Sequence, residues 1–377
     1  LSIRRQRQMC IRDRGIVIQV KDKHKEEVKK ILEDAGIGYV KLGKPTEERH
    51  ILVEKGDATY QFGIDYLRDV WYSTSYLLDR KQSMNGCAKK RFENYKKQPL
   101  EFVFDKSFTG KLSQFDLNPD RRTPTGIKAA IIREKGTNGE REMAYMLYLA
   151  GFDVKDVTMT DLVSGRETLE DINFIVFCGG FSNSDVLGSA KGWAGAFLFN
   201  PKAKAALDNF YARKDTLSLG VCNGCQLMIE LNLINPDFTK KAKMLHNDSH
   251  KFESKFVGVT VPMNRSVMFG SLSGSKLGIW VAHGEGKFSL PYHEDKYNVV
   301  LKYSYDEYPG NPNGSDYSVA GLASPDGRHL AMMPHLERSC FPWQNAYYPA
   351  DRIKNDQITP WMEAFVNARK WIEMNKK

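Results

Sequence analysis

The chain lacks any apolar run near the 20 or so residues that a membrane-spanning helix needs. Only 6 cysteines are scattered over its 377 residues, so no disulfide framework is indicated. Its Arg-rich start also lacks the apolar stretch of a secretory signal. We therefore expect no membrane partner and a reducing, cytoplasmic location.

Basic residues exceed acidic ones, but no stretch combines a basic stripe with interleaved aromatic side chains. The formal net charge is +9, and residues 1–14 hold five arginines against one aspartate. The remaining excess is dispersed among acidic residues, whereas nucleic-acid-binding proteins concentrate it on one face. We expect no nucleic-acid partner, because an anionic small molecule or an acidic protein surface accounts for the charge equally well.

The length favours two domains. Residues 1–14 show neither a helical nor a strand period and begin without Met, so we expect them to be non-native or disordered, with the native protein starting further upstream. Residues 15–84 are too short for a complete domain and suggest the tail of an α+β domain. Residues 85–125 lose periodicity and suggest a linker that docks domains. The elements expected before this linker are strands at 16–20 and 51–53 and helices at 28–35 and 64–78.

From residue 126 to the C-terminus, strands alternate with helices, which predicts an α/β domain with a mostly parallel sheet flanked by helices. Its strands are continuous apolar runs, as in sheets that are buried on both faces. Residues 251–330 are richer in short strands and predict β-rich additions around this sheet. The expected strands are 128–133, 152–157, 174–178 and 217–221, and the expected helices include 137–149 and one around 203–210.

The segment around Cys222 predicts a reactive cysteine. An apolar strand leads directly into Cys222, and an apolar helix follows. Gly220 and Gly224 flank the cysteine and permit the sharp strand-to-helix turn of a nucleophile elbow. The helix N-terminus favours the thiolate, which is the attacking species.

Other roles for this cysteine are a redox pair with Cys225, half of a zinc site, or a buried structural thiol. A zinc site needs two further ligands, and only His246 and His250 form a nearby pair. We expect Cys225 to pack beneath the elbow, since it lies one helical turn further on.

A thiolate nucleophile needs a histidine that a third group orients. His335 follows an apolar strand, and Glu337 stands two residues later, so an extended segment directs both side chains to the same side. The alternative is an exposed turn after a strand. The turn Gly179, Gly180, Phe181 and Ser182 after another strand suits an oxyanion hole, although glycine pairs are common in ordinary turns.

Three motifs in this order resemble the class I (triad) glutamine amidotransferases. They are Gly179-Gly180-Phe-Ser182, Gly220-Val-Cys222-Asn-Gly224-Cys-Gln226 and Pro334-His335-Leu-Glu337-Arg338. Within that family, three further segments look like the C-terminal part of a large purine-biosynthesis ligase: Arg133–Glu142, Gly192–Ala194 and Ala282–Gly286. Where the family often has Pro, this chain has Leu336, and His and Glu are retained.

The resemblance implies that Cys222 attacks glutamine and that His335 protonates the departing ammonia, with Glu337 completing the triad. It implies that residues 126–377 form the amidotransferase domain and residues 15–84 the end of a synthetase domain. The upstream synthetase would use ATP and Mg²⁺ to convert formylglycinamide ribonucleotide to its amidine. Glutamine hydrolysis needs no cofactor, and we expect no metal ligands in this chain.

The resemblance also implies substrate contacts beyond the triad: Asn223, Gln226, Asn247, Ser249, His283 and Glu285. By itself the chain should show at most weak glutaminase activity and no amidine synthesis. The alternatives are the glutaminase part of another synthetase, a cysteine hydrolase on the same scaffold, or a regulatory module without turnover.

Overall fold

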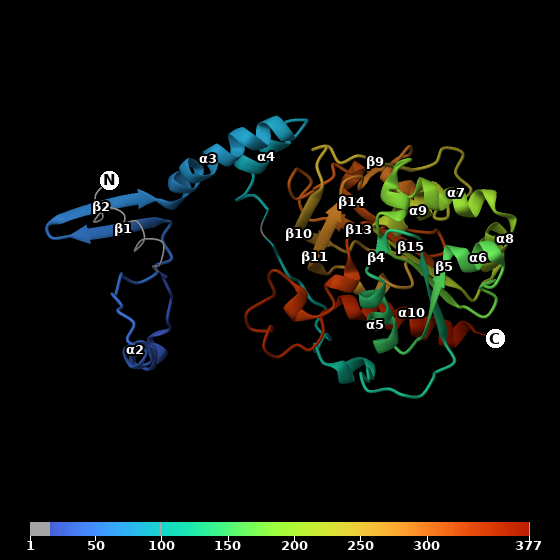
Figure 1. Ribbon diagram of the computed structural model, residues 1–377, viewed down its shortest axis with the longest axis horizontal. Coiled ribbons are helices and arrows are strands. Elements are labelled where there is room, and N and C mark those ends of the chain that lie inside the picture. The colour runs from blue at the N-terminus through green and yellow to red at the C-terminus, as the bar shows by residue number, and fades with distance from the viewer. Residues whose placement is uncertain (1–15, 99, 377) are drawn as a thin grey trace. The chain divides into compact units, whose positions relative to one another are not determined.

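The computed structural model describes residues 16–98 and 100–376 (Figure 1). The expectations for residues 1–14 therefore lie outside the described residues. The chain divides into two compact units, one ending at Arg68 and one running from Asp69 to the C-terminus.

The first unit contains helix α2 (Lys25–Asp34) and the antiparallel hairpin of β1 (His50–Lys55) and β2 (Ala58–Gly63), followed by the start of α3 (Ile64–Gln82). The strand expected at 16–20 does not form. No described strand pairs with residues 16–20, and a strand needs a partner to satisfy its backbone N–H and C=O groups. No described residue up to Arg68 is buried, so this unit has no core of its own.

The second unit begins with the rest of α3 and with α4 (Cys87–Glu93), so the predicted linker includes a helix. The chain then runs along the sheet, where the backbones of Val103 and Lys276 exchange two hydrogen bonds of 2.8 and 3.1 Å. The aromatic rings of Phe102, Phe104 and Tyr348 pack together beyond this point. These contacts attach the segment firmly to the second unit.

One nine-stranded sheet forms the centre of this unit, in the order β11-β10-β13-β14-β15-β8-β6-β3-β5. From β15 to β5 all pairings are parallel, which confirms the predicted parallel α/β sheet. The other pairings are antiparallel, so the short-strand region extends the sheet itself. The strands are β3 (Lys128–Arg133), β5 (Asp153–Thr158), β6 (Phe174–Phe177), β8 (Leu217–Val221), β10 (Glu253–Thr260), β11 (Lys276–His283), β13 (Asn298–Tyr303), β14 (Val319–Ala323) and β15 (His329–Met332).

Helices cover both faces of the sheet (Figure 1). Helices α5 and α10 pack together on one face, and α9 lies on the other with α7 beside it. Every residue of β6 and β8 is buried between these layers, as the continuous apolar runs predict. The helices are α5 (Glu140–Leu149), α6 (Met159–Ser164), α7 (Lys191–Phe199), α8 (Pro201–Ala212), α9 (Asn223–Glu230) and α10 (Trp361–Asn375).

Two short ladders lie outside the main sheet: β4 (Thr137–Asn138) with β7 (Gly179–Gly180), and β9 (Lys243–Leu245) with β12 (Lys287–Ser289). The helix expected from residue 137 begins only at Glu140, because the backbone before it pairs with the glycine turn. Short 3-10 turns occur at 22–24, 112–115, 182–185, 270–272, 294–296, 316–318, 336–338 and 342–344. None of the described helices is both long and apolar enough to cross a membrane.

Candidate active site

Cys222 occupies the sharp turn between β8 and α9. Its φ of 53° and ψ of −106° are strained for a residue with a side chain. The neighbouring parallel strand fixes this conformation, because the Cys222 N–H donates to the carbonyl of Met332 at 2.9 Å. The cysteine is almost buried and stands at the carboxyl ends of the parallel strands, where open α/β sheets place their sites.

The two glycines of the predicted elbow are required by packing. A Cβ at Gly220 would lie 2.5 Å from the carbonyl oxygen of Gly224. A Cβ at Gly224 would collide with the carbonyl of Phe177 on β6. Only residues without a side chain therefore let α9 approach the sheet closely enough to form this turn.

Cys225 lies beneath the elbow, as expected, and is fully buried. Burial raises the pKa of its thiol well above the ordinary value, which disfavours a thiolate there. Across the residues that the structure describes, no group of three or more His, Cys, Asp or Glu side chains could hold a metal ion. The local geometry thus favours Cys222 over Cys225 as the reactive thiol.

His335 and Glu337 meet as a buried pair. The Nδ1 atom of His335 lies 2.7 Å from Oε1 of Glu337, and both side chains are almost completely buried. The extended segment expected here is instead a 3-10 turn at 336–338, which brings the carboxylate back to the imidazole. The backbone N–H of His335 donates to the carbonyl of Trp280 at 2.8 Å and thereby holds the start of this turn.

Cys222 completes the arrangement, because it lies close enough to His335 to influence the pKa of the imidazole. Burial of His335 opposes its charged form, but the negative charges of Glu337 and Cys222 outweigh burial and raise its pKa to about 10. An imidazole with this pKa stays protonated at neutral pH and stabilises a neighbouring thiolate. The structure thus brings Cys222 together with the pair His335 and Glu337, which lies far from it in the sequence.

The glycine turn after β6 lies directly against this group. A Cβ at Gly179 would approach Cε1 of His335 to 2.8 Å and the Cβ of Cys222 to 3.4 Å. Gly180 has a φ of 111°, which side chains rarely permit. The glycine backbone therefore packs directly against His335 and Cys222, which a side chain at Gly179 would prevent.

Two amides of this turn are not available as oxyanion donors. The N–H of Phe181 donates to the carbonyl of Gly136 at 2.9 Å, and the N–H of Ser182 donates to Oδ1 of Asn223 at 3.0 Å. These two N–H groups are therefore engaged within the protein, and the role expected for the turn 179–182 stays a prediction. The side chain of Phe181 is half exposed and packs against Phe252.

Asn223 and Gln226 brace the elbow through their side chains. The Asn223 amide donates to Oε1 of Gln226 at 2.9 Å, and the Gln226 amide donates to the carbonyl of Glu285 at 2.7 Å. Both ends of the Gln226 amide are therefore engaged within the protein. The carboxylate of Glu285 accepts from the N–H of Ser189 at 3.2 Å, and this contact joins the 283–286 turn to the loop before α7.

The side chain of Asn247 also holds the 283–286 turn. Its Oδ1 accepts from Nδ1 of His283 at 3.1 Å and from the N–H of Gly286 at 3.0 Å. Its amide donates to the carbonyls of His283 at 2.7 Å and of Lys251 at 2.9 Å. Burial, assisted by the charge of His335, lowers the pKa of His283 to about 3, so this imidazole is neutral. Ser249 bonds instead to Glu253 at 2.6 Å, within a separate ion cluster.

Two backbone carbonyls on β11 also contact this site, and no sequence pattern predicts them. The Cys222 thiol lies 3.5 Å from the carbonyl of Ala282, and Trp280 receives the N–H of His335. Backbone groups act irrespective of residue type, so only the strand pairing reveals them. Asp185 was also missed: its carboxylate accepts from the Asn223 amide at 3.2 Å.

Comparison with known proteins identifies the family to which this domain belongs. The family model of the CobB/CobQ-like glutamine amidotransferase domain matches residues 126–372. The chain belongs to this family. Among solved structures, the domain is similar to PurLQS from Thermotoga maritima, at 27% identity and a TM-score of 0.50, over 67% of this chain and 99% of that one.

Curated relatives of this amidotransferase are named phosphoribosylformylglycinamidine synthase. The Homo sapiens protein is 38% identical over 392 residues, and the Arabidopsis thaliana protein, "probable" and chloroplastic or mitochondrial by name, is 37% identical over 386 residues. Each match covers 95% of this chain but only 29% and 27% of the relatives' lengths, respectively. The amidotransferase chain thus spans little more than a quarter of the relatives that it resembles.

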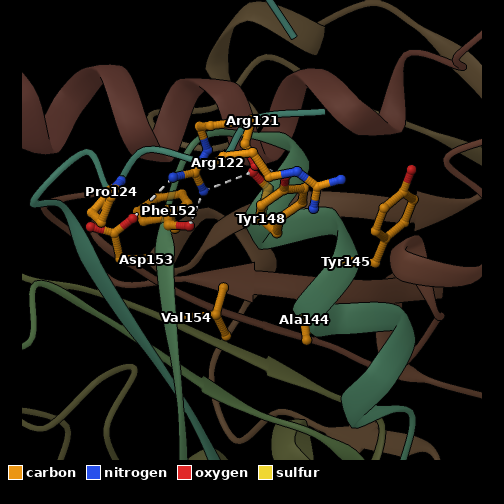
Figure 2. A pocket seen from close by; sticks show the side chains of 9 residues that line it. All are labelled: Arg121, Arg122, Pro124, Ala144, Tyr145, Tyr148, Phe152, Asp153 and Val154. Carbon is orange, nitrogen blue, oxygen red and sulfur yellow. Dashed lines mark hydrogen bonds and ion pairs between the residues drawn. The ribbon is translucent and has the colours of Figure 1, made fainter. Parts of the chain in front are cut away.

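A surface hollow of about 470 Å³ in this amidotransferase lies away from the triad, between α5 and β5 (Figure 2). The guanidinium of Arg121 in its wall already donates to Asp153 at 3.0 Å and to the carbonyl of Phe152 at 2.7 Å, and it lies over the ring of Tyr148. That charge is therefore committed to fixing the loop before β3. None of the residues predicted for the active site lines this hollow.

Proposed function

We propose that this chain is the glutamine-hydrolysing part of a phosphoribosylformylglycinamidine synthase. The observation that carries the proposal is the buried arrangement of Cys222, His335 and Glu337 at the carboxyl ends of the parallel strands. The family membership and the names of the relatives support glutamine as the substrate.

In the proposed reaction, the Cys222 thiolate attacks the carboxamide carbon of glutamine and forms a tetrahedral intermediate. The C–N bond then breaks as the imidazolium of His335 gives its proton to the leaving nitrogen, releasing ammonia and leaving a glutamyl thioester. The neutral imidazole next takes a proton from water, which attacks the thioester and releases glutamate. Glu337 holds the imidazole in the required orientation throughout.

The developing oxyanion needs N–H donors close to Cys222. We assign this role to backbone groups at the start of α9, whose first N–H groups have no partner within the helix, together with the glycine turn 179–180. Gln226 and Asn247 would act by shaping the turns around the substrate, since their side-chain amides are hydrogen-bonded to protein partners, and His283 would do so through Nδ1.

In the proposed whole enzyme, ammonia passes to a synthetase part that uses ATP and Mg²⁺ on formylglycinamide ribonucleotide. Residues 15–84 would be the end of that part and residues 126–377 the amidotransferase domain. The described residues offer no cluster that fits a metal ion, so we assign Mg²⁺ to the longer polypeptide. Cysteines that are free and buried, such as Cys178 and Cys340, agree with a reducing compartment such as the cytoplasm.

A glutamine-analogue chloroketone tests the glutaminase assignment. We expect one label per chain, located by peptide mass on Cys222 and absent in Cys222→Ala. Cys225→Ala serves as the matched control and should be labelled like the wild type. Labelling of Cys225, or labelling that glutamine does not slow, would contradict the proposal.

The specific synthetase is tested separately. Adding the upstream synthetase polypeptide with its nucleotide should raise ammonia release from glutamine by this chain. An unchanged rate would favour the glutaminase of another synthetase, and an absence of any thioester chemistry would favour a regulatory module.

A further inference from the structure

A second buried charge cluster lies outside the triad, and the proposed mechanism does not use it. Its centre is Asp79 in the last turn of α3, which is buried. Oδ1 of Asp79 accepts from the Ser83 hydroxyl at 2.6 Å and from the Lys251 ammonium at 2.8 Å, and Oδ2 accepts from Arg91 at 2.9 Å. Burial acts to raise the pKa of Asp79, but these donors outweigh it and lower the pKa, so the carboxylate is ionised.

Glu253 at the start of β10 forms the other half of this cluster and is also buried. Its carboxylate accepts from Ser249 at 2.6 Å, from the Tyr308 hydroxyl at 2.9 Å and from Lys255 at 2.6 Å. Arg91 joins the halves, because its second terminal nitrogen lies 3.5 Å from Glu253. The cluster therefore alternates negative and positive groups. It joins residues 249–255 to residues 79–91, where α3 ends and α4 begins, which we call the α3–α4 corner.

Two further hydrogen bonds, both to backbone carbonyls, join the same two segments. The N–H of Met84 donates to the carbonyl of Ser249 at 3.1 Å, and the amide of Asn85 donates to the carbonyl of Asp248 at 2.8 Å. The α3–α4 corner thus holds residues 248–251 through side chains and backbone together. These residues follow Asn247 directly in the chain.

Asn247 links residues 248–251 to the active site. Its side chain makes three hydrogen bonds to the 283–286 turn, and its amide also donates to the carbonyl of Lys251 at 2.9 Å. The same turn receives the Gln226 amide, and the preceding carbonyl of Ala282 contacts the Cys222 thiol. Each step from Asp79 to Cys222 is therefore a hydrogen bond, an ion pair or a covalent connection along the chain.

We propose that Asp79 is a positioning residue for the glutamine site, acting through Lys251 and Asn247 on the 283–286 turn. This inference rests on the proposed glutaminase function. A buried ion cluster contributes little net stability compared with apolar packing, but it fixes one geometry when all its members are paired. Loss of the Asp79 charge leaves Arg91 and Lys251 without their shared partner and releases the 248–251 segment.

The test compares a reagent that must fit the substrate site with one that need not. The rate at which a glutamine-analogue chloroketone labels Cys222 is measured alongside that of iodoacetamide in Asp79→Asn. We expect the first rate to fall about tenfold or more, since misplacement by about 1 Å can reduce rates a hundredfold. The iodoacetamide rate should change far less, because the triad itself is intact. Asp171→Asn, which breaks an exposed ion pair with Lys128, is the matched control and should match the wild type.

Arg91→Lys is the second variant, and it decides the matter if Asp79→Asn does not fold. It keeps the charge but loses the fork that joins Asp79 and Glu253, so we expect a smaller loss, again selective for the glutamine analogue. Equal slowing of both reagents, or unchanged labelling with only a lower melting temperature, would overturn the inference. Failure of the wild type to react with the analogue at Cys222 would instead overturn the proposed function.

Discussion

Replacing Glu337 with glutamine tests how the triad produces its thiolate. The carboxylate is the largest influence that raises the pKa of His335 to about 10 against the opposing effect of burial. An unpaired buried imidazolium costs about 3–5 kcal/mol, so His335 in Glu337→Gln should lose its proton at neutral pH. Cys222 then lacks the positive neighbour that favours its thiolate.

The expected size of the effect follows from the thiolate fraction. A thiol with an ordinary pKa of about 8.5 is only about 3% thiolate at pH 7, so alkylation of Cys222 by iodoacetamide should slow about 30-fold. Glutamine hydrolysis should fall further, by about 10²- to 10⁴-fold, because proton donation to ammonia is lost as well. The difference in alkylation rate should shrink as the pH rises above about 8.5.

The assay is the rate of Cys222 alkylation between pH 6 and 10, with circular dichroism to confirm folding. Glu142→Gln is the matched control, because that carboxylate is partly exposed and lies 3.6 Å from Arg338 near the same turn. A folded Glu337→Gln protein that reacts at the wild-type rate at pH 7 would refute the reasoning. It would show that another group holds the thiolate.

Three further outcomes are expected. Gly224→Ala should lower the free energy of unfolding, measured by urea titration, by about 1–3 kcal/mol, because the added methyl group meets the carbonyl of Phe177. An unchanged urea midpoint would mean that the backbone of the elbow shifts to accept the methyl group without cost. The His335–Glu337 pair should stabilise the fold fully below the unfolded imidazole pKa of about 6.5 and lose this contribution as pH rises toward 10, so the stability difference between wild type and Glu337→Gln should shrink over that range. Cys225→Ala should keep the wild-type alkylation rate while lowering the melting temperature, and loss of labelling would reassign the nucleophile.

Local sequence patterns determined much of this fold. Continuous apolar runs identified β3, β6 and β8, because a strand buried on both faces needs apolar residues at every position. The pattern failed where pairing decides the structure. Residues 137–138 resemble the start of a helix, yet they form a strand because the distant 179–180 turn supplies their partner.

The sequence by itself also determined the elbow at Cys222 and the pairing of His335 with Glu337, since each depends on residues close together in the chain. Only the tertiary structure decided which polar groups face the substrate side and which are consumed internally. The N–H of Ser182 donates to Asn223, 41 positions away, and the side-chain amide of Gln226 donates to Glu285, 59 positions away. The N–H of Phe181 donates to Gly136, which is also distant in the sequence. Hydrogen bonds across such separations arise from the packing of whole elements, so no local period records them.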